Sequence, residues 1–296
     1  MAASQSTTTG AKVTFALLAV QVFYGVHYLA AKWIVSELAP GAWAVLRTVS
    51  AWLIVFAIAL AMKRRLPPWK DVAILALCAF FGIALNQALF LEGIVRTTAA
   101  HSALINSQIP SFALLWALIL GKENLSRRKA LSFLAGMAGV LVLLEVENFR
   151  FASEYLVGDL LTIGNAASFG FFLVISRNVI RRNDPVAATA VVLFFGALGL
   201  SVYGAGDLLA ADLSALSQRA IGAMIFAILA ATVATYFLNL WALKRVQTSR
   251  VALYVFLQPL IASITGVFVL HETIGFRFAV AAALVLTALV LRDESA

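Results

Sequence analysis

The sequence predicts an all-α membrane protein with ten transmembrane helices, arranged as two five-helix repeats of inverted topology. Three observations predict this fold class. Hydrophobic residues make up 62% of the 296 residues and charged residues 12%, and the mean hydropathy is +0.96, which is too apolar for a soluble domain. Apolar runs of helix length recur along the whole chain. Two of these runs share a pattern around a central proline.

Ten apolar runs have the length that a helix needs to cross a bilayer, about 17 to 25 residues. The first run is too long for the apolar core of a signal peptide and lacks a cleavage site of small residues, so we keep it as a spanning helix. No long polar stretch divides the chain, which predicts a single membrane domain over residues 1–296. The runs lie at about 13–36, 39–62, 71–92, 97–120, 128–146, 156–179, 185–206, 219–241, 246–270 and 275–292.

A central proline marks the fourth and the ninth run. Aligning Pro110 with Pro259, at an offset of 149 residues, also aligns Glu123 with Glu272. A proline inside a helix removes a backbone hydrogen bond and leaves a carbonyl that lipid does not satisfy. We therefore expect both helices to be broken or bent beside a wet interior, with Pro110 and Pro259 as hinges. Ordinary packing kinks are the alternative.

The repeat extends to the earlier helices of each half. At an offset of 145 residues, Gly25 aligns with Gly170. Repeat one spans about 13–146 and repeat two about 156–292. Because each half holds five helices, the second half enters the membrane with the opposite orientation. Many secondary transporters have this arrangement, with the substrate site at the repeat interface.

Lysines and arginines are distributed unevenly between alternate loops. Sixteen of the 22 lie on one side of the predicted membrane and four on the other, while Lys32 and Arg47 lie within helices. Cytoplasmic loops carry the excess of positive charge in membrane proteins, so both termini are predicted to be cytoplasmic. The same distribution accounts for the net charge of +8 without a nucleic-acid partner.

The motifs around the two prolines resemble a known family. After Pro110 come a Leu-Gly-x-Glu-like end at residues 120–123 and a segment of small residues at 135–139. After Pro259, residues 270–272 repeat the first of these features. The pattern resembles the EamA repeat of the drug/metabolite transporter superfamily, and the resemblance covers nearly the whole chain. Within that superfamily, the chain looks most like the bacterial exporters of aromatic amino acids.

The resemblance implies a function and a location. It implies a secondary exporter in the bacterial inner membrane that moves small amphipathic metabolites, such as aromatic or other amino acids, by alternating access. A broad-specificity drug or metabolite exporter is the alternative. The resemblance also implies that the protein interacts with a small-molecule substrate and the lipid bilayer. We expect a monomer or weak dimer and no cofactor. Lys122 and His271 depart from the usual family pattern at helix ends.

Polar residues inside the predicted helices mark the candidate substrate site, because each is costly in hydrocarbon and tends to face the bundle interior. Gln21, Tyr24 and Tyr28 share one stripe of the first run, and His27 lies beside them. For any one polar side chain, an interhelical hydrogen bond is the simpler role; the collected stripes favour a solvated cavity. The candidate substrate-binding residues are Gln21, Tyr24, His27, Tyr28, Asn86, His101, Gln108, Asn165, Tyr236, Asn239 and Gln258.

Ionisable residues are scarce in the middle of the predicted helices. No Asp or Glu of the sequence lies well inside a run, so a purely cationic substrate is a poor match. Arg47 is eight residues into the second run. It can meet a substrate carboxylate, but we expect it to extend to the membrane surface or to bond to backbone carbonyls.

Enzyme functions find little support in the sequence. Residues 204–207 spell the G-x-G-D of intramembrane aspartyl proteases, but that chemistry needs a second carboxylate at the site, and no second aspartate lies well inside a predicted helix to partner Asp207. Cys78 is the one cysteine, which excludes an intrachain disulfide and a thiolate metal cluster. The sequence contains neither H-E-x-x-H nor a phosphate-binding G-x-x-x-x-G-K-[ST]. We therefore expect no catalytic residues and no metal site.

Overall fold

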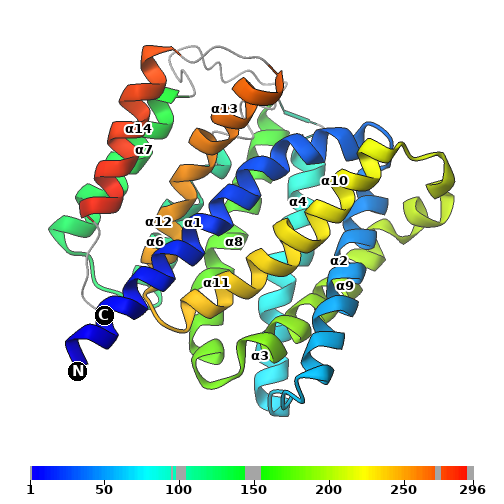
Figure 1. The fold of residues 1–296 in the computed structure, drawn as a ribbon, viewed down its shortest axis with the longest axis horizontal. Helices are drawn as coiled ribbons and strands as arrows, with labels where there is room; N and C mark the ends of the chain where they lie inside the picture. The colour runs from blue at the N-terminus through cyan, green and yellow to red at the C-terminus, as the bar shows by residue number, and fades with distance from the viewer. Residues whose placement is uncertain (1, 95, 98–104, 144–154, 271–274, 292–296) are drawn as a thin grey trace.

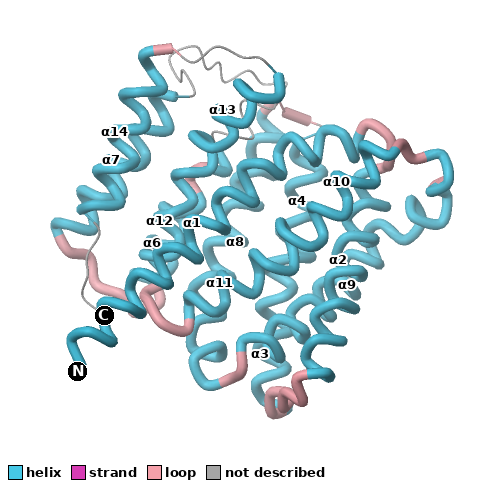
Figure 2. Tube along the Cα trace, viewed as in Figure 1, coloured by secondary structure: helices cyan, strands magenta, loops and turns pink. Residues whose placement is uncertain are grey.

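The structure is a computed structural model that describes residues 2–94, 96–97, 105–143, 155–270 and 275–291. Within these ranges helices alternate with loops and turns, and no strand is present (Figure 2). A helix satisfies its own backbone hydrogen bonds, which lipid requires of a spanning segment. The predicted all-α class is confirmed for the described residues.

The first half of the chain forms helices up to residue 143. α2 begins at Pro40, because the fixed φ angle of proline suits a first helical turn where no amide donor is needed. The third run is one long helix whose middle widens into a π turn. The elements are α1 (Ala2–Val35), α2 (Pro40–Ala61), α3 (Trp69–Ala79), the π turn η1 (Phe80–Ala84), α4 (Leu85–Ile94), α6 (Ile109–Ile119) and α7 (Arg127–Leu143).

The second half repeats this order. Asp184 caps α9 by accepting hydrogen bonds from the amides of Val186 (3.0 Å) and Ala187 (3.2 Å). The eighth run again contains a π turn in its middle. The elements are α8 (Leu156–Arg182), α9 (Pro185–Ala210), the 3-10 turn η3 (Leu213–Ala215), α10 (Gln218–Ile228), the π turn η4 (Leu229–Ala234), α11 (Thr235–Leu243), α12 (Thr248–Leu253), the 3-10 turn η5 (Tyr254–Phe256), α13 (Leu257–Leu270) and α14 (Phe276–Leu291).

Six helices in the described part of the chain are long and apolar enough to cross a bilayer, so the chain is a multi-pass membrane protein. They coincide with the first three predicted spans of each half. The other four predicted spans are shorter or interrupted helices, or extend outside the described residues, so the total of ten stays a prediction. The six are Ala11–Val35, Pro40–Ala61, Trp69–Gly93, Leu156–Arg182, Pro185–Ala210 and Gln218–Leu243.

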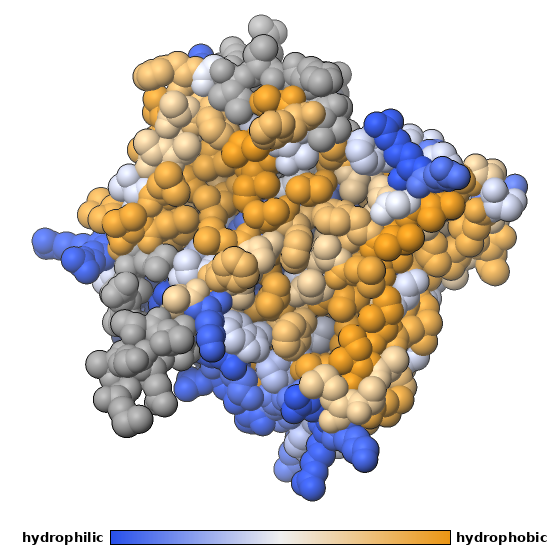
Figure 3. All heavy atoms as spheres, in the orientation of Figure 1, coloured by the Kyte–Doolittle hydropathy of each residue, from blue (hydrophilic) through white to orange (hydrophobic). Residues whose placement is uncertain are grey.

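The molecular surface agrees with burial in lipid. The face drawn in Figure 3 is hydrophobic over the central parts of its helices, and hydrophilic residues gather near its lower edge and its upper right corner. Large apolar side chains such as Val202 and Leu209 on α9 are 89% and 88% exposed. In water such exposure would favour aggregation, whereas in a bilayer lipid chains cover these side chains.

Helices of the two halves pack against each other in corresponding pairs. α2 lies along α9, and α7 lies along α14 at the edge of the bundle (Figure 1). α1 contacts α13, and α8 makes the corresponding contact with α6. The α2–α9 approach is very close: a Cβ atom built on Gly204 would lie 2.3 Å from the carbonyl oxygen of Gly41. Each contact has a counterpart when the halves are exchanged, as a pseudo-twofold relation produces.

Both proline-containing helices are interrupted near their proline. Pro110 is the second residue of α6 and follows a turn at residues 107–108. Pro259 is the third residue of α13, directly after the 3-10 turn η5. The expected breaks are therefore present, although each proline lies in the first turn of a new helix rather than at the middle of a continuous one. Whether the breaks act as hinges stays a prediction.

Candidate functional site

A cavity of about 170 Å³ lies inside the bundle, between helices of the two halves. Seven of the ten predicted spans contribute residues to its lining, and α2 is one of them. The walls combine aromatic rings with amides, hydroxyls and one guanidinium, the mixture of apolar walls and few polar groups that is typical of small-molecule sites. The lining residues are Tyr24, His27, Arg47, Asn86, Gln87, Phe90, Asn106, Ile109, Asn165, Phe169, Ala231, Thr232, Tyr236 and Gln258.

Arg47 is the permanently charged residue in this lining. Arg47 is 9% exposed, and its Nη1 donates a hydrogen bond to Nε2 of His27 at 3.2 Å. The guanidinium carbon lies 5.8 Å from the ring centroid of Trp43. The expectation that Arg47 extends to the membrane surface is wrong, because α2 turns this residue toward α1, where the His27 imidazole accepts its hydrogen bond, and the indole of Trp43, also on α2, lies beside the guanidinium.

The Arg47–His27 contact defines the state of both side chains. Arginine has donors but no acceptor, so His27 Nε2 accepts, and in the neutral ring the hydrogen is on Nδ1. His27 Nδ1 and Arg47 Nε are buried and have no hydrogen-bond partner among the described residues. Both of these atoms are hydrogen-bond donors, so the site contains two buried N–H groups without an acceptor among the described residues.

Two amides brace the wall where α4 meets α8. Asn86 Nδ2 donates to the backbone oxygen of Asn165 (3.1 Å), and Asn165 Nδ2 donates to the backbone oxygen of Asn86 (2.7 Å). This reciprocal pair is the interhelical role that the sequence left open as the alternative to substrate binding. Both residues also line the cavity, so this interhelical pair forms part of its wall.

The π turns join the wall to the other half of the protein. A π turn displaces backbone carbonyls from their usual amide partners. In η1, the carbonyl of Gly82 accepts from the Tyr236 hydroxyl (3.1 Å) and the carbonyl of Phe81 accepts from the Ser168 hydroxyl (2.6 Å). In η4, Thr232 donates back to the carbonyl of Ala227 (2.8 Å). Tyr236 thus connects a cavity wall of the second half to the irregular turn of the first.

The structure brings six of the eleven predicted binding residues into the cavity lining. These are Tyr24, His27, Asn86, Asn165, Tyr236 and Gln258. That they bind substrate stays a prediction.

The other five predicted residues are placed differently. Gln21 is buried behind the lining, where its Oε1 accepts from Gln258 Nε2 at 2.9 Å. Gln108 bonds locally to Ser107 and Ser111, and Asn239 is buried in α11 outside the lining. His101 lies outside the described residues, and the side chain of Tyr28 is likewise not described.

Sequence reasoning missed several lining residues for physical reasons. Gln87, Asn106 and Thr232 are polar residues inside predicted spans, so the polarity rule can find them, but it does not rank them above their neighbours. Four apolar residues carry no such signal, because a cavity-facing phenylalanine is indistinguishable in sequence from a lipid-facing one. These are Phe90, Ile109, Phe169 and Ala231.

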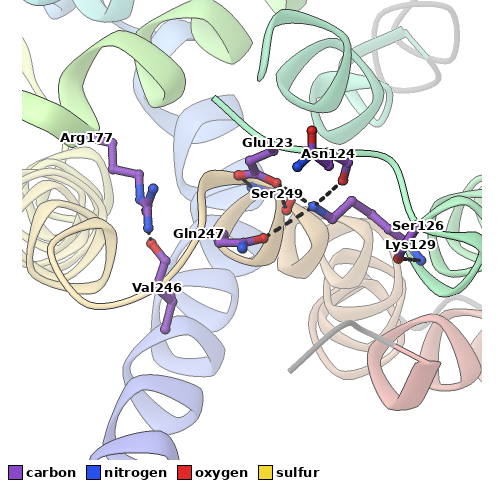
Figure 4. Close-up of polar contacts among 8 residues, drawn as sticks. All are labelled: Glu123, Asn124, Ser126, Lys129, Arg177, Val246, Gln247 and Ser249. Carbon is purple, nitrogen blue, oxygen red and sulfur yellow. Dashed lines mark hydrogen bonds and ion pairs between the residues drawn. The ribbon is translucent and has the colours of Figure 1, made fainter. Parts of the chain in front are cut away.

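A second polar cluster ties the two halves together away from the cavity (Figure 4). Lys129 Nζ donates to Glu123 Oε2 (2.9 Å), to the Asn124 carbonyl (3.1 Å) and to Gln247 Oε1 (3.3 Å). Glu123 Oε1 accepts from the Ser249 amide (3.0 Å), in the first turn of α12. The carboxylate therefore caps a helix of the second half while it pairs with a lysine of the first.

Another hollow, of about 450 Å³, lies against α2, α3 and α9. Its lining has no charged or amide side chain to orient a polar solute, so the inner cavity remains the candidate substrate site. The lining residues are Trp52, Phe56, Leu66, Pro67, Trp69, Val72, Ala190, Val191, Phe194 and Phe195.

Known proteins resemble the chain over most of its length. An uncharacterized transporter of Archaeoglobus fulgidus is 24% identical over 209 residues, 70% of each chain. A WAT1-related chloroplastic protein of Arabidopsis thaliana is 28% identical over 284 residues, 91% of this chain and 66% of that protein. The uncharacterized transporter YwfM of Bacillus subtilis is 28% identical over 245 residues, 81% of this chain and 78% of that protein.

The fold is also found in a solved structure. One crystal structure superposes with a TM-score of 0.80 and covers 95% of this chain and 96% of its own, at 18% identity, which shows a shared fold alone. The EamA-like transporter family matches twice, at residues 11–145 and 156–292. Together these two matches cover nearly the whole chain. The protein therefore belongs to the EamA-like transporter family.

Proposed function

We propose that the protein is a secondary exporter that moves small amphipathic metabolites, such as aromatic or other amino acids, across the bacterial inner membrane. The observation that carries this proposal is the inner cavity, which is lined by helices of both halves and combines rings with polar groups. Substrate sites of inverted-repeat transporters lie at this kind of interface. Family membership supports transport of a small substrate.

The size and chemistry of the cavity favour a metabolite. A volume of about 170 Å³ would hold on the order of ten water molecules. Tyr24, Phe90, Phe169 and Tyr236 offer ring surfaces to an apolar side chain, and the amide of Gln258 offers hydrogen bonds to its polar end. A solute that has both an apolar side chain and a polar end would contact the rings and the polar groups of the lining at once.

Alternating access is the mechanism that we propose for this cavity. The helix break before Pro110 and the one before Pro259 lie in corresponding positions of the two halves. Asn106 and Ile109 beside the first break, and Gln258 beside the second, line the cavity. Movement at either break would therefore change access to the substrate. Both termini are cytoplasmic in this proposal, because the loop charges favour that orientation.

Transport by the purified protein in liposomes tests the proposal. Counterflow of a panel of radiolabelled amino acids should exceed that of protein-free liposomes, most strongly for Phe, Tyr and Trp. Tyr24→Ala should reduce counterflow several-fold because it removes a cavity wall. Tyr203→Ala is the matched control, since Tyr203 bonds to Glu92 outside the lining (3.0 Å) and should leave the rate unchanged. Equal rates for protein and protein-free liposomes with every amino acid would contradict amino acid export.

Two other functions predict different outcomes. A broad-specificity drug exporter would move lipophilic dyes as well as amino acids in the same assay. An intramembrane aspartyl hydrolase would cleave substrate and would need paired carboxylates. Among the described residues the cavity lining holds no carboxylate, and Asp207 contacts Gly41 at the far end of α9, so the geometry supports the hydrolase least.

A further inference from the structure

Arg47 is a buried cation inside a membrane protein, and none of the ion pairs among the described residues includes it. A buried charge of this kind is costly unless an opposite charge and hydrogen bonds compensate it. The guanidinium cannot lose its charge, since arginine stays protonated in proteins. No carboxylate of the described residues supplies this compensation, and an anion that enters the cavity would.

The free donors define what that partner is. His27 occupies Arg47 Nη1, which leaves the edge formed by Nε and Nη2, and Nε has no partner among the described residues. A carboxylate binds this edge of an arginine with two parallel hydrogen bonds. His27 Nδ1 is a further unpartnered donor in the same lining. An ammonium group has donors but no acceptor, so it cannot satisfy any of these atoms.

We propose that Arg47 and His27 form a carboxylate-binding subsite, so that the transported metabolite is recognised by its carboxylate rather than by an amino group. This inference rests on the proposed function and narrows it. Trp43 stacks beside the guanidinium and His27 anchors Nη1, so two neighbours fix the orientation of Arg47 before substrate arrives. The ring-lined remainder of the cavity then receives the apolar part of the acid.

Four probes that share a phenyl group separate the contribution of the carboxylate to binding from that of the amino group. Thermal melting of the purified protein in detergent is measured with L-phenylalanine, 3-phenylpropanoate, L-phenylalaninamide and phenethylamine at equal concentrations, because a ligand that binds the folded state raises the melting temperature. The two carboxylates should stabilise the protein. The amide and the amine, which lack a carboxylate, should not.

Substitutions then assign the effect to Arg47. Arg47→Met should weaken 3-phenylpropanoate binding roughly ten- to a hundredfold, since hydrogen bonds to charged groups contribute about that much affinity. Arg47→Lys keeps the charge but loses the two-donor edge and should give an intermediate loss. Arg219→Met is the matched control, because Arg219 also stacks on a tryptophan, Trp33 at 4.2 Å, but lies outside the cavity lining.

Each outcome decides the proposal. If the amide or amine binds wild type as well as the acids do, or if Arg47→Met retains full affinity for the acids, the subsite is wrong while the proposed export function stands. If none of the four probes binds or is transported, both proposals fail for this class of substrate. Should Arg47→Met not fold, Arg47→Lys and the probe series on wild type still decide, because equal binding of acid and amide overturns the inference.

Discussion

Lys129 Nζ lies 2.9 Å from Glu123 Oε2, and the two side chains are 7% and 1% exposed. The pair sits where the loop between α6 and α7 meets the start of α12, so it joins the first half of the chain to the second (Figure 4). Because Glu123 also accepts from the Ser249 amide, the carboxylate is held by both halves. The ion pair is therefore a structural connection between two parts that alternating access would move relative to each other.

Removing one member of this pair should destabilise the protein strongly. Lys129→Met leaves a buried carboxylate without its counter-ion, which costs about 3–5 kcal/mol in comparable buried pairs. Thermal melting in detergent measures the effect. Arg96→Met is the matched control, since Arg96 pairs with Glu92 at an exposed site (48% and 41%), where a pair contributes about 0–1 kcal/mol. A melting temperature of Lys129→Met no lower than that of the control would contradict this role.

The hydroxyl of Tyr236 should stabilise the π turn of the other half. Tyr236→Phe keeps the ring and leaves the Gly82 carbonyl without its donor, which should cost roughly 1–3 kcal/mol for a buried acceptor. Melting temperature and transport rate are the two measurements. Tyr203→Phe removes a hydroxyl at a partly exposed site and serves for comparison. Equal melting temperatures for the two variants would mean that η1 needs no hydrogen bond from Tyr236.

Loop charges make a topology prediction. In a Cys78→Ala background, a cysteine at Arg127 should be protected from an impermeant thiol reagent added outside the cell, and a cysteine at Arg219 should react. Both positions are exposed, so access from one side of the membrane decides labelling. Labelling of Arg127→Cys from outside, with protection of Arg219→Cys, would overturn the inverted-repeat orientation.

A fall in pH should weaken the contact between the α1–α2 connection and the start of α10. The Ser217 hydroxyl and amide each donate to the Glu37 carboxylate at 2.7 Å, and these bonds lower the pKa of Glu37 below its ordinary value of 4.5. A lowered folded-state pKa means that this stabilisation is present above about pH 4.5 and disappears as pH falls through the folded pKa. Glu37→Gln should therefore melt below wild type at pH 7, and the difference should shrink toward pH 3. A difference that is constant with pH would assign the effect to packing.

The sequence predicted the fold class because hydropathy and helix length depend on local composition. It placed polar candidate residues inside the spans, and six of the eleven, from α1, α4, α8, α11 and α13, do line one cavity. Composition cannot say which way a helix is rotated, however. Arg47 was therefore expected at the membrane surface, although α2 directs it inward to His27.

Two further features depend on contacts that local sequence does not encode. In the π turn η1, side chains from other helices, Tyr236 and Ser168, donate to the displaced carbonyls. Lys129 counted as one of the cytoplasmic loop charges, yet it is 5% exposed because Glu123 and Gln247 surround its ammonium. Such partners are known only once the two halves are packed together.

The two helix breaks lead to a last prediction, on conformational exchange. Both prolines lie in the first turn of a helix, a position where proline is compatible with helical geometry. Alanine at either position supplies an amide donor, which allows the helix to extend back across the break, through residues 107–108 or through η5. If the breaks are equivalent hinges, Pro110→Ala and Pro259→Ala should favour opposite-facing states, because the two halves are inverted.

A cysteine replacing Asn106, which lines the cavity beside the first break, reports on these states when Cys78 has been removed. Its reactivity toward an impermeant thiol reagent, measured from each side of the membrane, should shift one way in Pro110→Ala and the other way in Pro259→Ala. Ser111→Ala is the control, because it changes the first turn of α6 without touching the backbone donor that proline lacks. Shifts in the same direction, or none in either variant, would make the breaks features of packing, since inverted hinges must act on opposite faces of one cavity.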